Sequence, residues 1–250
     1  MPPRYPLPWH IGVLLLRDAL RLRHRSFSAD ARACVELLSP PPKILNSENI
    51  PQYGPALLVT NHYYRPGFKA WWIALAISAA VPQDVHWMMT SAWTFLGSLE
   101  PLSQWLFPRV ARVYGFTPTP PMPPDPRDVE MRAHAVRSVL RVARQTPGVI
   151  IALAPEGRDN SGGVLGPLPP GVGRFIEKLM HTCQRILPIG VYEDANHFCL
   201  NFGLPFTLDL PQGLTPRERD RKVGQTVMQA IARQLPDQLR GEYRETSQFY

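Results

Sequence analysis

The stretch PALLVTNH, residues 55–62, is an apolar run that ends in two polar residues, Asn61 and His62. A short, continuous apolar run such as residues 56–60 is typical of a strand that is covered on both faces. Further along the chain the pattern returns, because the apolar residues 149–153 lead into the polar loop APEGR, residues 154–158. Ligands collect beyond the carboxyl ends of strands in open α/β sheets, so these two loops predict one site assembled from distant segments.

Strand and helix patterns alternate along the rest of the chain. The expected strands are residues 85–89, 110–114 and 186–191, with a hairpin pair at 198–202 and 206–210. The expected helices are residues 68–80, 96–107, 127–145, 171–183 and 215–235, the last with Thr215 and Glu218 in a capping box. This alternation predicts one α/β domain over residues 39–250, with a mostly parallel central sheet flanked by helices.

Residues 1–38 are expected to form an N-terminal helical segment. A helix over residues 7–25 would place four apolar side chains on one side and most of its arginines off it; the four are Trp9, Val13, Leu16 and Leu20. Such a basic amphipathic helix either packs its apolar face on the domain or lies on an anionic bilayer. The two contacts are compatible if one edge of the helix packs on the domain and the other edge touches lipid.

Net charge and residue spacing limit the kinds of partner and site that this chain is expected to have. The net charge of +7 favours anionic partners such as membrane surfaces, phosphorylated small molecules or nucleic acid. Nucleic acid is not expected, because the chain has no zinc-finger spacing, no RNA-binding aromatic signature and no long lysine run. The cysteines form no C-x-x-C pair and the histidines lack metal-ligand spacing, so we expect no disulfide framework and no metal site. This usage fits a reducing cytosol, and no apolar run is long enough for a signal peptide or a membrane span.

The chemistry of the two loops centres on His62. Histidine is the side chain best suited to proton transfer near neutral pH. Gly157 lets the backbone approach a ligand, and Arg158 offers donors for phosphate or carboxylate. Alone, His62 is compatible with a structural histidine and residues 155–157 with a turn. Their order and separation in one chain make a shared site the more specific hypothesis.

On these residues the chain resembles the glycerolipid acyltransferase family, the glycerol-3-phosphate and lysophosphatidic acid acyltransferases. That family has Asn-His, four residues and Asp in its first block, Phe-Pro-Glu-Gly-Thr-Arg-Ser in its third, and an apolar strand with proline in its fourth. Asn61-His62 matches the first block, residues 154–157 match the third, and residues 186–191 match the fourth. The resemblance covers residues 40–245 and implies a fold like that of the glycerol-3-phosphate acyltransferases.

The chain departs from the family pattern at three points. Gly67 stands where the first block has its acid, the third block lacks its threonine so that Arg158 follows Gly157 directly, and residues 114–118 lack the arginine of the second block. No Asp or Glu lies between His62 and Asp84, so a replacement acid near the histidine in sequence is not expected. Glu156, a water molecule or a backbone carbonyl remain as groups that would fix the ring.

The resemblance implies transfer of an acyl chain from acyl-CoA or acyl carrier protein, as co-substrate without a further cofactor, to a glycerolipid-type hydroxyl. It makes His62 the catalytic base and assigns substrate binding to Asn61, Pro155, Glu156, Gly157 and Arg158. Such a protein of lipid biosynthesis is expected in the cytoplasm, peripheral on the inner face of the membrane. Because of Gly67, an inactive relative that binds lipid or acyl thioester at a membrane surface stays open, as does a hydrolase that uses water as acceptor.

Overall fold

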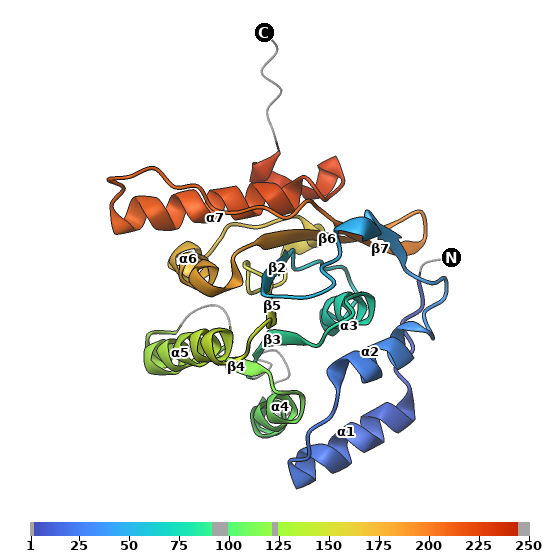
Figure 1. Cartoon of the computed structure of the whole chain (residues 1–250). Helices are drawn as coiled ribbons and strands as arrows, with labels where there is room; N and C mark the ends of the chain where they lie inside the picture. Colours follow the sequence, from blue (N-terminus) through green and yellow to red (C-terminus); the bar gives the residue numbers. More distant parts are fainter. Residues whose placement is uncertain (1–2, 92–99, 122–124, 245–250) are drawn as a thin grey trace.

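A seven-stranded sheet forms the centre of the protein (Figure 1). The computed structural model describes residues 3–91, 100–121 and 125–244. In sheet order the strands are β1 (Lys43–Leu45), β7 (His197–Phe202), β6 (Ile186–Asp194), β2 (Ala56–Thr60), β5 (Ile150–Leu153), β3 (Val85–Thr90) and β4 (Thr117–Thr119). Only the β6–β7 pair among these neighbours is antiparallel. The predicted mostly parallel sheet is therefore confirmed.

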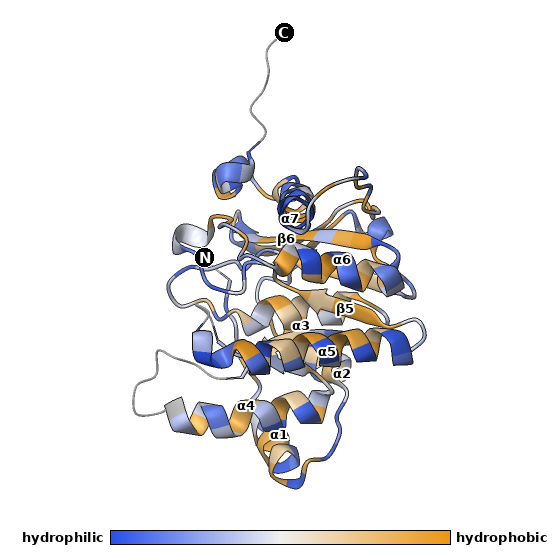
Figure 2. Ribbon diagram, turned by 90° about the vertical axis from the view of Figure 1, so that its left-hand side faces the viewer, coloured by the Kyte–Doolittle hydropathy of each residue, from blue (hydrophilic) through white to orange (hydrophobic). Residues whose placement is uncertain are grey.

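Helices flank this sheet. They are α1 (Trp9–Arg21), α2 (Phe27–Val35), α3 (Trp71–Ala80), α4 (Glu100–Tyr114), α5 (Val129–Gln145), α6 (Val172–Cys183) and α7 (Pro216–Ala232). In Figure 1, α5 and α6 lie to one side of the sheet, α3 lies to the other, and α7 runs beside β6. Figure 2 shows α1 beside α4, at the end of the molecule opposite α7. None of the helices in the described ranges is both long and apolar enough to cross a bilayer.

Two predicted strands are wrong. Residues 110–114 are the last turns of α4, and the strand follows at β4. Ala111 and Val113 are buried and alternate with more exposed residues. This two-residue alternation is also typical of a strand, which explains the wrong prediction. The first residues of the expected helix, 96–99, lie outside the described ranges.

The second wrong strand is residues 206–210, which make one isolated bridge, from Phe206 to Ile186. The hairpin instead joins β6 to β7 through Ala195 and Asn196, both with positive φ angles of 44° and 63°. A two-residue turn with positive φ at both positions matches the twist of paired strands. The strand predicted to end at residue 191 therefore continues to Asp194.

The N-terminal helix is shorter than predicted. It ends at Arg21, where Leu22 takes a left-handed conformation with φ of 51°. A second helix, α2, begins after Ser26, whose hydroxyl accepts a hydrogen bond from the backbone N–H of Ala29. The capping box predicted at Thr215 and Glu218 is confirmed at the start of α7.

Strand β2 lies at the centre of the sheet and is buried along its whole length. It pairs in parallel with β5 on one side and with β6 on the other. The last described pairs are Val59 with Leu153 and Thr60 with Ile189. Because parallel strands end at the same edge, the loops that follow β2 and β5 leave the sheet side by side.

Candidate active site

Asn61 extends the sheet by one step beyond the end of β2. Its side-chain Nδ2 donates to the carbonyl of Val191 at 2.8 Å, and its Oδ1 accepts from the N–H of Val191 at 2.7 Å. The amide thus pairs with β6 as a strand residue would, at the point where the backbone of β2 turns away. Asn61 is buried, and both polar ends of its side chain are occupied by the protein. This clamp fixes the position of the next residue, His62.

Glu156 holds the backbone of His62 from the other neighbouring strand. The N–H of His62 donates to Oε2 of Glu156 at 2.7 Å, across 94 residues of sequence. The register of β2 and β5 continues into this contact, since Ala56 lies opposite Ile150 with the same offset. The expectation that the histidine and the glutamate-bearing loop meet is confirmed.

The second oxygen of Glu156 organises its own loop. Oε1 accepts from the N–H of Gly166 at 2.7 Å and from the side-chain amide of Asn160. Burial raises the pKa of the Glu156 carboxyl, while the donors from Gly166, His62 and Asn160 act in the opposite direction. With both oxygens engaged, the Glu156 carboxylate links the two loops through hydrogen bonds, and we call this link the Glu156 bracket. It faces the His62 backbone rather than the His62 ring.

The loop after β5 lies tightly against the loop after β2. Gly157 has a φ angle of 66°, and its N–H donates to the carbonyl of Ala154, which reverses the chain. At Gly163, a Cβ atom would lie 2.8 Å from the carbonyl oxygen of Tyr64 and 3.0 Å from the ring of Tyr63. Gly163 is therefore at a close packing contact between the two loops.

The side chain of His62 meets a carboxylate from this second loop. Its Nδ1 lies 2.8 Å from Oδ1 of Asp159. Nδ1 is enclosed, and the Asp159 oxygen lies at ion-pairing distance but out of line with a ring N–H. The His62 side chain is 23% exposed, so its exposed part belongs to the remaining ring atoms. Catalytic hydrogen bonds are often poorly aligned without substrate and tighten when it binds.

The absence of an acid at position 67 has a structural counterpart. Gly67 has a φ angle of 82°, a conformation that side chains other than glycine rarely adopt. Among the described residues, a Cβ atom placed there would meet only Nη1 of Arg65 within 4 Å. The loop after β2 thus turns sharply at Gly67 instead of presenting a side chain to the histidine.

Arg65 ties the far end of the His62 loop to β6. Its Nε and Nη2 atoms donate to the two oxygens of Glu193 at 2.6 and 2.7 Å. The hydroxyl of Tyr5 donates to the same carboxylate, and the Arg65 guanidinium lies over the Tyr5 ring. Desolvation, followed by the bond to Glu193, raises the pKa of the Tyr5 hydroxyl. The segment before α1 is thereby joined to the loop that carries His62.

The other residues predicted to bind substrate differ in their exposure to solvent. Pro155 is buried, whereas Gly157 and Arg158 are exposed. Arg158 has no hydrogen-bond or ion-pair partner among the described residues, so its guanidinium is available to an anion. The aromatic residues near His62 belong mostly to the core, since Tyr63 and Trp72 are buried.

The sequence prediction missed Asp159, because Glu156 was the one acid of the second loop considered as a partner for the His62 ring. The signal was present in the other loop, where Asp159 lies three positions after Glu156. Asn160, which holds the Glu156 carboxylate, was missed as well. Once the two loops are expected to meet, every acid of either loop is a candidate partner for the ring.

No family model and no curated protein matches this sequence. Among solved structures, it is similar to the crystal structure of the 1-acyl-sn-glycerophosphate (LPA) acyltransferase, PlsC, from Thermotoga maritima. The match covers 90% of this chain and 89% of that chain, with 14% sequence identity and a TM-score of 0.48. At that level of likeness, function has to be argued from the residues of this chain.

Proposed function

We propose that this protein transfers an acyl chain from a thioester to a hydroxyl acceptor of glycerolipid type, with His62 as the general base. The observation that carries the proposal is the meeting of His62 with the Pro155-Glu156-Gly157 loop at one edge of the sheet, through the bond from His62 to Glu156. The His62 ring is partly exposed there while its Nδ1 atom is enclosed. This leaves Nε2 as the nitrogen for substrate.

In the proposed reaction, Nε2 of His62 takes the proton of the acceptor hydroxyl as its oxygen attacks the thioester carbonyl carbon. The carbon–sulfur bond then breaks, and the leaving thiolate takes the proton from the imidazolium, which restores the base. Asn61 and Glu156 contribute by holding the two loops in position, and Pro155 is buried beside Glu156. Gly157 and Arg158 are the exposed groups that would contact an anionic acceptor such as a phosphate ester.

The test is an assay of radiolabelled acyl-CoA and acyl carrier protein thioesters against lysolipids and simple alcohols. We expect His62→Ala to lower the rate of acylated product formation by about 10²- to 10⁴-fold, the usual contribution of a general base. His181→Ala, at an exposed position on α6, is the matched control and should leave the rate unchanged. Free fatty acid as the product would indicate a hydrolase. Thioester binding without turnover, unaffected by His62→Ala, would indicate the non-catalytic lipid-binding alternative.

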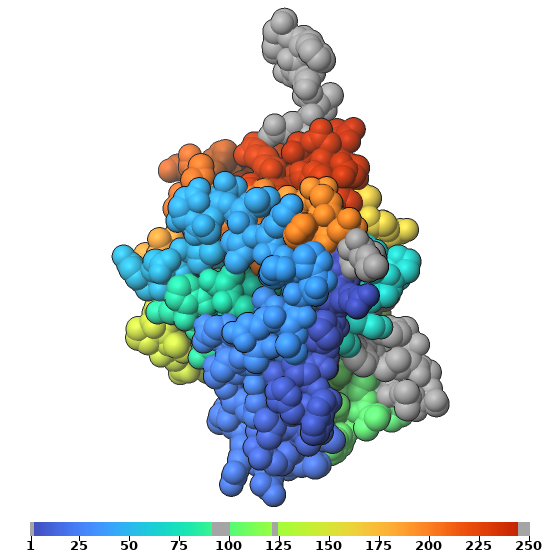
Figure 3. All heavy atoms as spheres, turned by 90° about the vertical axis from the view of Figure 1, so that its right-hand side faces the viewer, coloured from blue at the N-terminus to red at the C-terminus, as the bar shows by residue number. Residues whose placement is uncertain are grey.

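We also propose that α1 contacts the membrane that holds the acceptor. Its apolar side chains Trp9, Val13, Leu16 and Leu20 are all exposed, Trp9 to 78%. They recur at helical spacing on one side, and the residues that face the domain are Ile11, Asp18 and Ala19. Figure 3 shows the N-terminal residues on the surface at the lower end of the molecule.

Charge favours an anionic bilayer as the partner of this surface. Arg21 and Arg23 are exposed and have no ion-pair partner among the described residues. Lipid headgroups of negative charge would meet these arginines while the apolar side chains enter the boundary of the acyl chains. The protein would then work from the cytoplasm on the inner face of the membrane.

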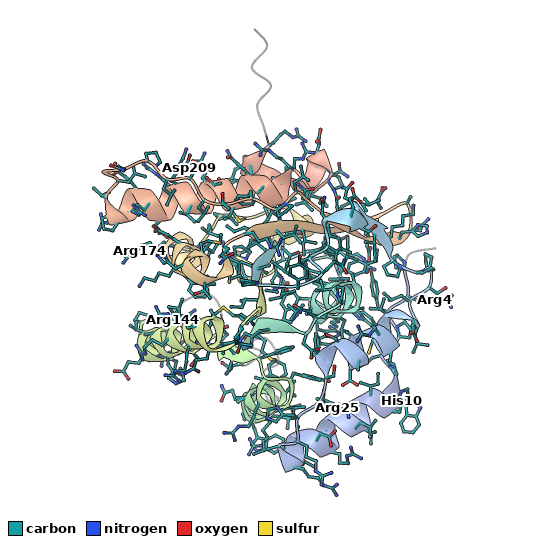
Figure 4. The ribbon with its side chains drawn as sticks, in the orientation of Figure 1. Arg4, His10, Arg25, Arg144, Arg174 and Asp209 are labelled. Atoms are coloured by element: carbon teal, nitrogen blue, oxygen red, sulfur yellow. The ribbon has the colours of Figure 1, made fainter. Side chains whose placement is uncertain are left out.

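The α1 helix is firmly attached to the domain. Arg25, in the turn between α1 and α2 (Figure 4), donates to Asp18 of α1 at 2.8 Å and to Asp30 of α2 at 2.6 and 2.9 Å. The hydroxyl of Tyr114 in α4 donates to Asp30 at 2.8 Å. Tyr5, which reaches the His62 loop through Glu193, lies four residues before the first residue of α1, a span of at most about 14 Å. The start of α1 is therefore connected, through Tyr5 and Glu193, to the loop that carries His62.

Vesicle binding tests this contact. We expect binding to vesicles with anionic lipid, weaker binding at high salt, and little binding to zwitterionic vesicles. Replacing both Val13 and Leu16 with serine should weaken binding about thirtyfold, since each substitution loses roughly 1 kcal/mol of apolar burial. Leu204→Ser is the matched control, because Leu204 is 76% exposed and follows β7. Equal loss in both variants, or none in either, would contradict the assignment to α1.

A further inference from the structure

We infer that Asp159 is the carboxylate that orients the His62 imidazole, taking the part of the acid that the loop after β2 lacks at Gly67. The inference rests on the proposed function and adds a positioning residue to it. The acid would come from the loop after β5, on the neighbouring strand, instead of from the loop of the histidine itself. The contact of 2.8 Å between Oδ1 of Asp159 and Nδ1 of His62 carries the inference.

The enclosed Nδ1 atom supports this assignment. It is shielded from solvent and has no well-aligned hydrogen-bond partner, although the Asp159 oxygen is its close neighbour. A buried ring nitrogen without a partner is costly, so a small rotation that aligns Nδ1–H with Asp159 is favourable. With the proton held on Nδ1, the lone pair is on Nε2, as a base that faces substrate requires.

Asp159 is held at this place by the Glu156 bracket. Glu156 binds the backbone of His62 with one oxygen and the side chain of Asn160 with the other. Asp159 directly precedes Asn160, so the same carboxylate fixes both the histidine and the residue next to the acid. Gly163 of the same loop lies close against Tyr63 and Tyr64, so the two loops are packed together without an intervening side chain.

The other candidate acid does not have the required geometry. Both oxygens of Glu156 are occupied by His62 N–H, Gly166 N–H and Asn160. Asp159 is 49% exposed, which allows its oxygens to turn toward the ring. Exposure also lets water replace part of its effect, so its loss should cost less than the roughly 10⁴-fold seen when a buried orienting carboxylate is changed to its amide.

The experiment compares Asp159→Asn and Asp159→Ala with wild type in the acyl-transfer assay. We expect kcat to fall about 10²- to 10³-fold and KM to change less than about threefold, because the residue acts through His62 and not on substrate. Asp209→Asn is the matched control, at an exposed position beside α7 (Figure 4). Normal kcat in both Asp159 variants, together with an inactive His62→Ala, would overturn the inference and leave the proposed function intact. If His62→Ala keeps full activity, the proposed function itself fails.

A second readout does not depend on turnover. Nitrogen-15 spectra of histidine-labelled protein at alkaline pH report which ring nitrogen carries the proton, and His62→Ala assigns the signal. We expect the Nδ1–H form of His62 in wild type and in Asp209→Asn, and a shift toward the Nε2–H form in Asp159→Asn. An Nε2–H form in wild type, or an identical signal in Asp159→Asn, would show that Asp159 does not orient the ring.

Discussion

Replacing Asn61 with leucine separates a structural role from a substrate-binding role. Leucine has nearly the same shape as asparagine, so the packing of the site should change little. The substitution removes both partners of Val191, whose N–H and carbonyl each bind the Asn61 amide. Because Asn61 is buried, water cannot take its place.

The expected loss follows from those two contacts. A buried donor or acceptor without a partner costs about 1–3 kcal/mol, so the two groups of Val191 together lower the free energy of unfolding by about 2–6 kcal/mol. Asn61→Asp should also be costly, because it keeps the acceptor for the Val191 N–H but sets a carboxylate oxygen against the Val191 carbonyl. Both variants should disturb the position of His62.

Urea unfolding measures this loss. With a slope near 3 kcal/mol/M, the midpoint for Asn61→Leu should fall by roughly 0.7–2 M while the slope stays constant. Gln145→Leu is the control, since Gln145 is an exposed amide at the end of α5, and its change should stay within about 0.5 kcal/mol. An Asn61→Leu protein as stable as wild type but with weakened substrate binding would refute the clamp. It would return Asn61 to the substrate-binding residues.

Three further outcomes can be checked. Hydrogen bonds from Arg17 and Arg25 lower the pKa of Asp18 from 3.8 to about 2. The stability that ionised Asp18 contributes is therefore complete above pH 3.8 and is lost as the pH falls toward 2. Asp18→Asn should make the free energy of unfolding, measured with denaturant, depend less on pH in this acid range. Gly190→Ala should destabilise by about 1–3 kcal/mol because its Cβ would lie 2.3 Å from the carbonyl oxygen of Gln234, and an unchanged melting temperature would contradict that packing. Gly12→Ala should instead raise stability by about 0.5–1 kcal/mol in the same melting assay, because no described residue outside its own helix turn lies within 4 Å of the added Cβ.

Much of the site could be predicted because its parts are local. The apolar run before Asn61 and the one before Ala154 are strands β2 and β5, and the polar residues after them do meet at one edge of the sheet. Parallel strands of similar length bring their carboxyl ends together whatever the details of packing. The role of each residue within the site was harder to predict. Asn61 and Glu156 look the same in the sequence if they bind a ligand and if they hold the backbone.

The sequence by itself determined the buried central strands β2, β5 and β6, the capping box of Thr215 that begins α7, and the two loops that carry the polar groups. These features depend on residues close together in the chain, so residue spacing and hydrogen-bonding capacity are enough to predict them. Only the tertiary structure decided that Asp159 faces His62 and that the apolar side of α1 is exposed. Both depend on residues far apart in the chain, because the register between β2 and β5 sets which acid reaches the ring, and the packing of α1 against α4 sets which of its faces is left to solvent.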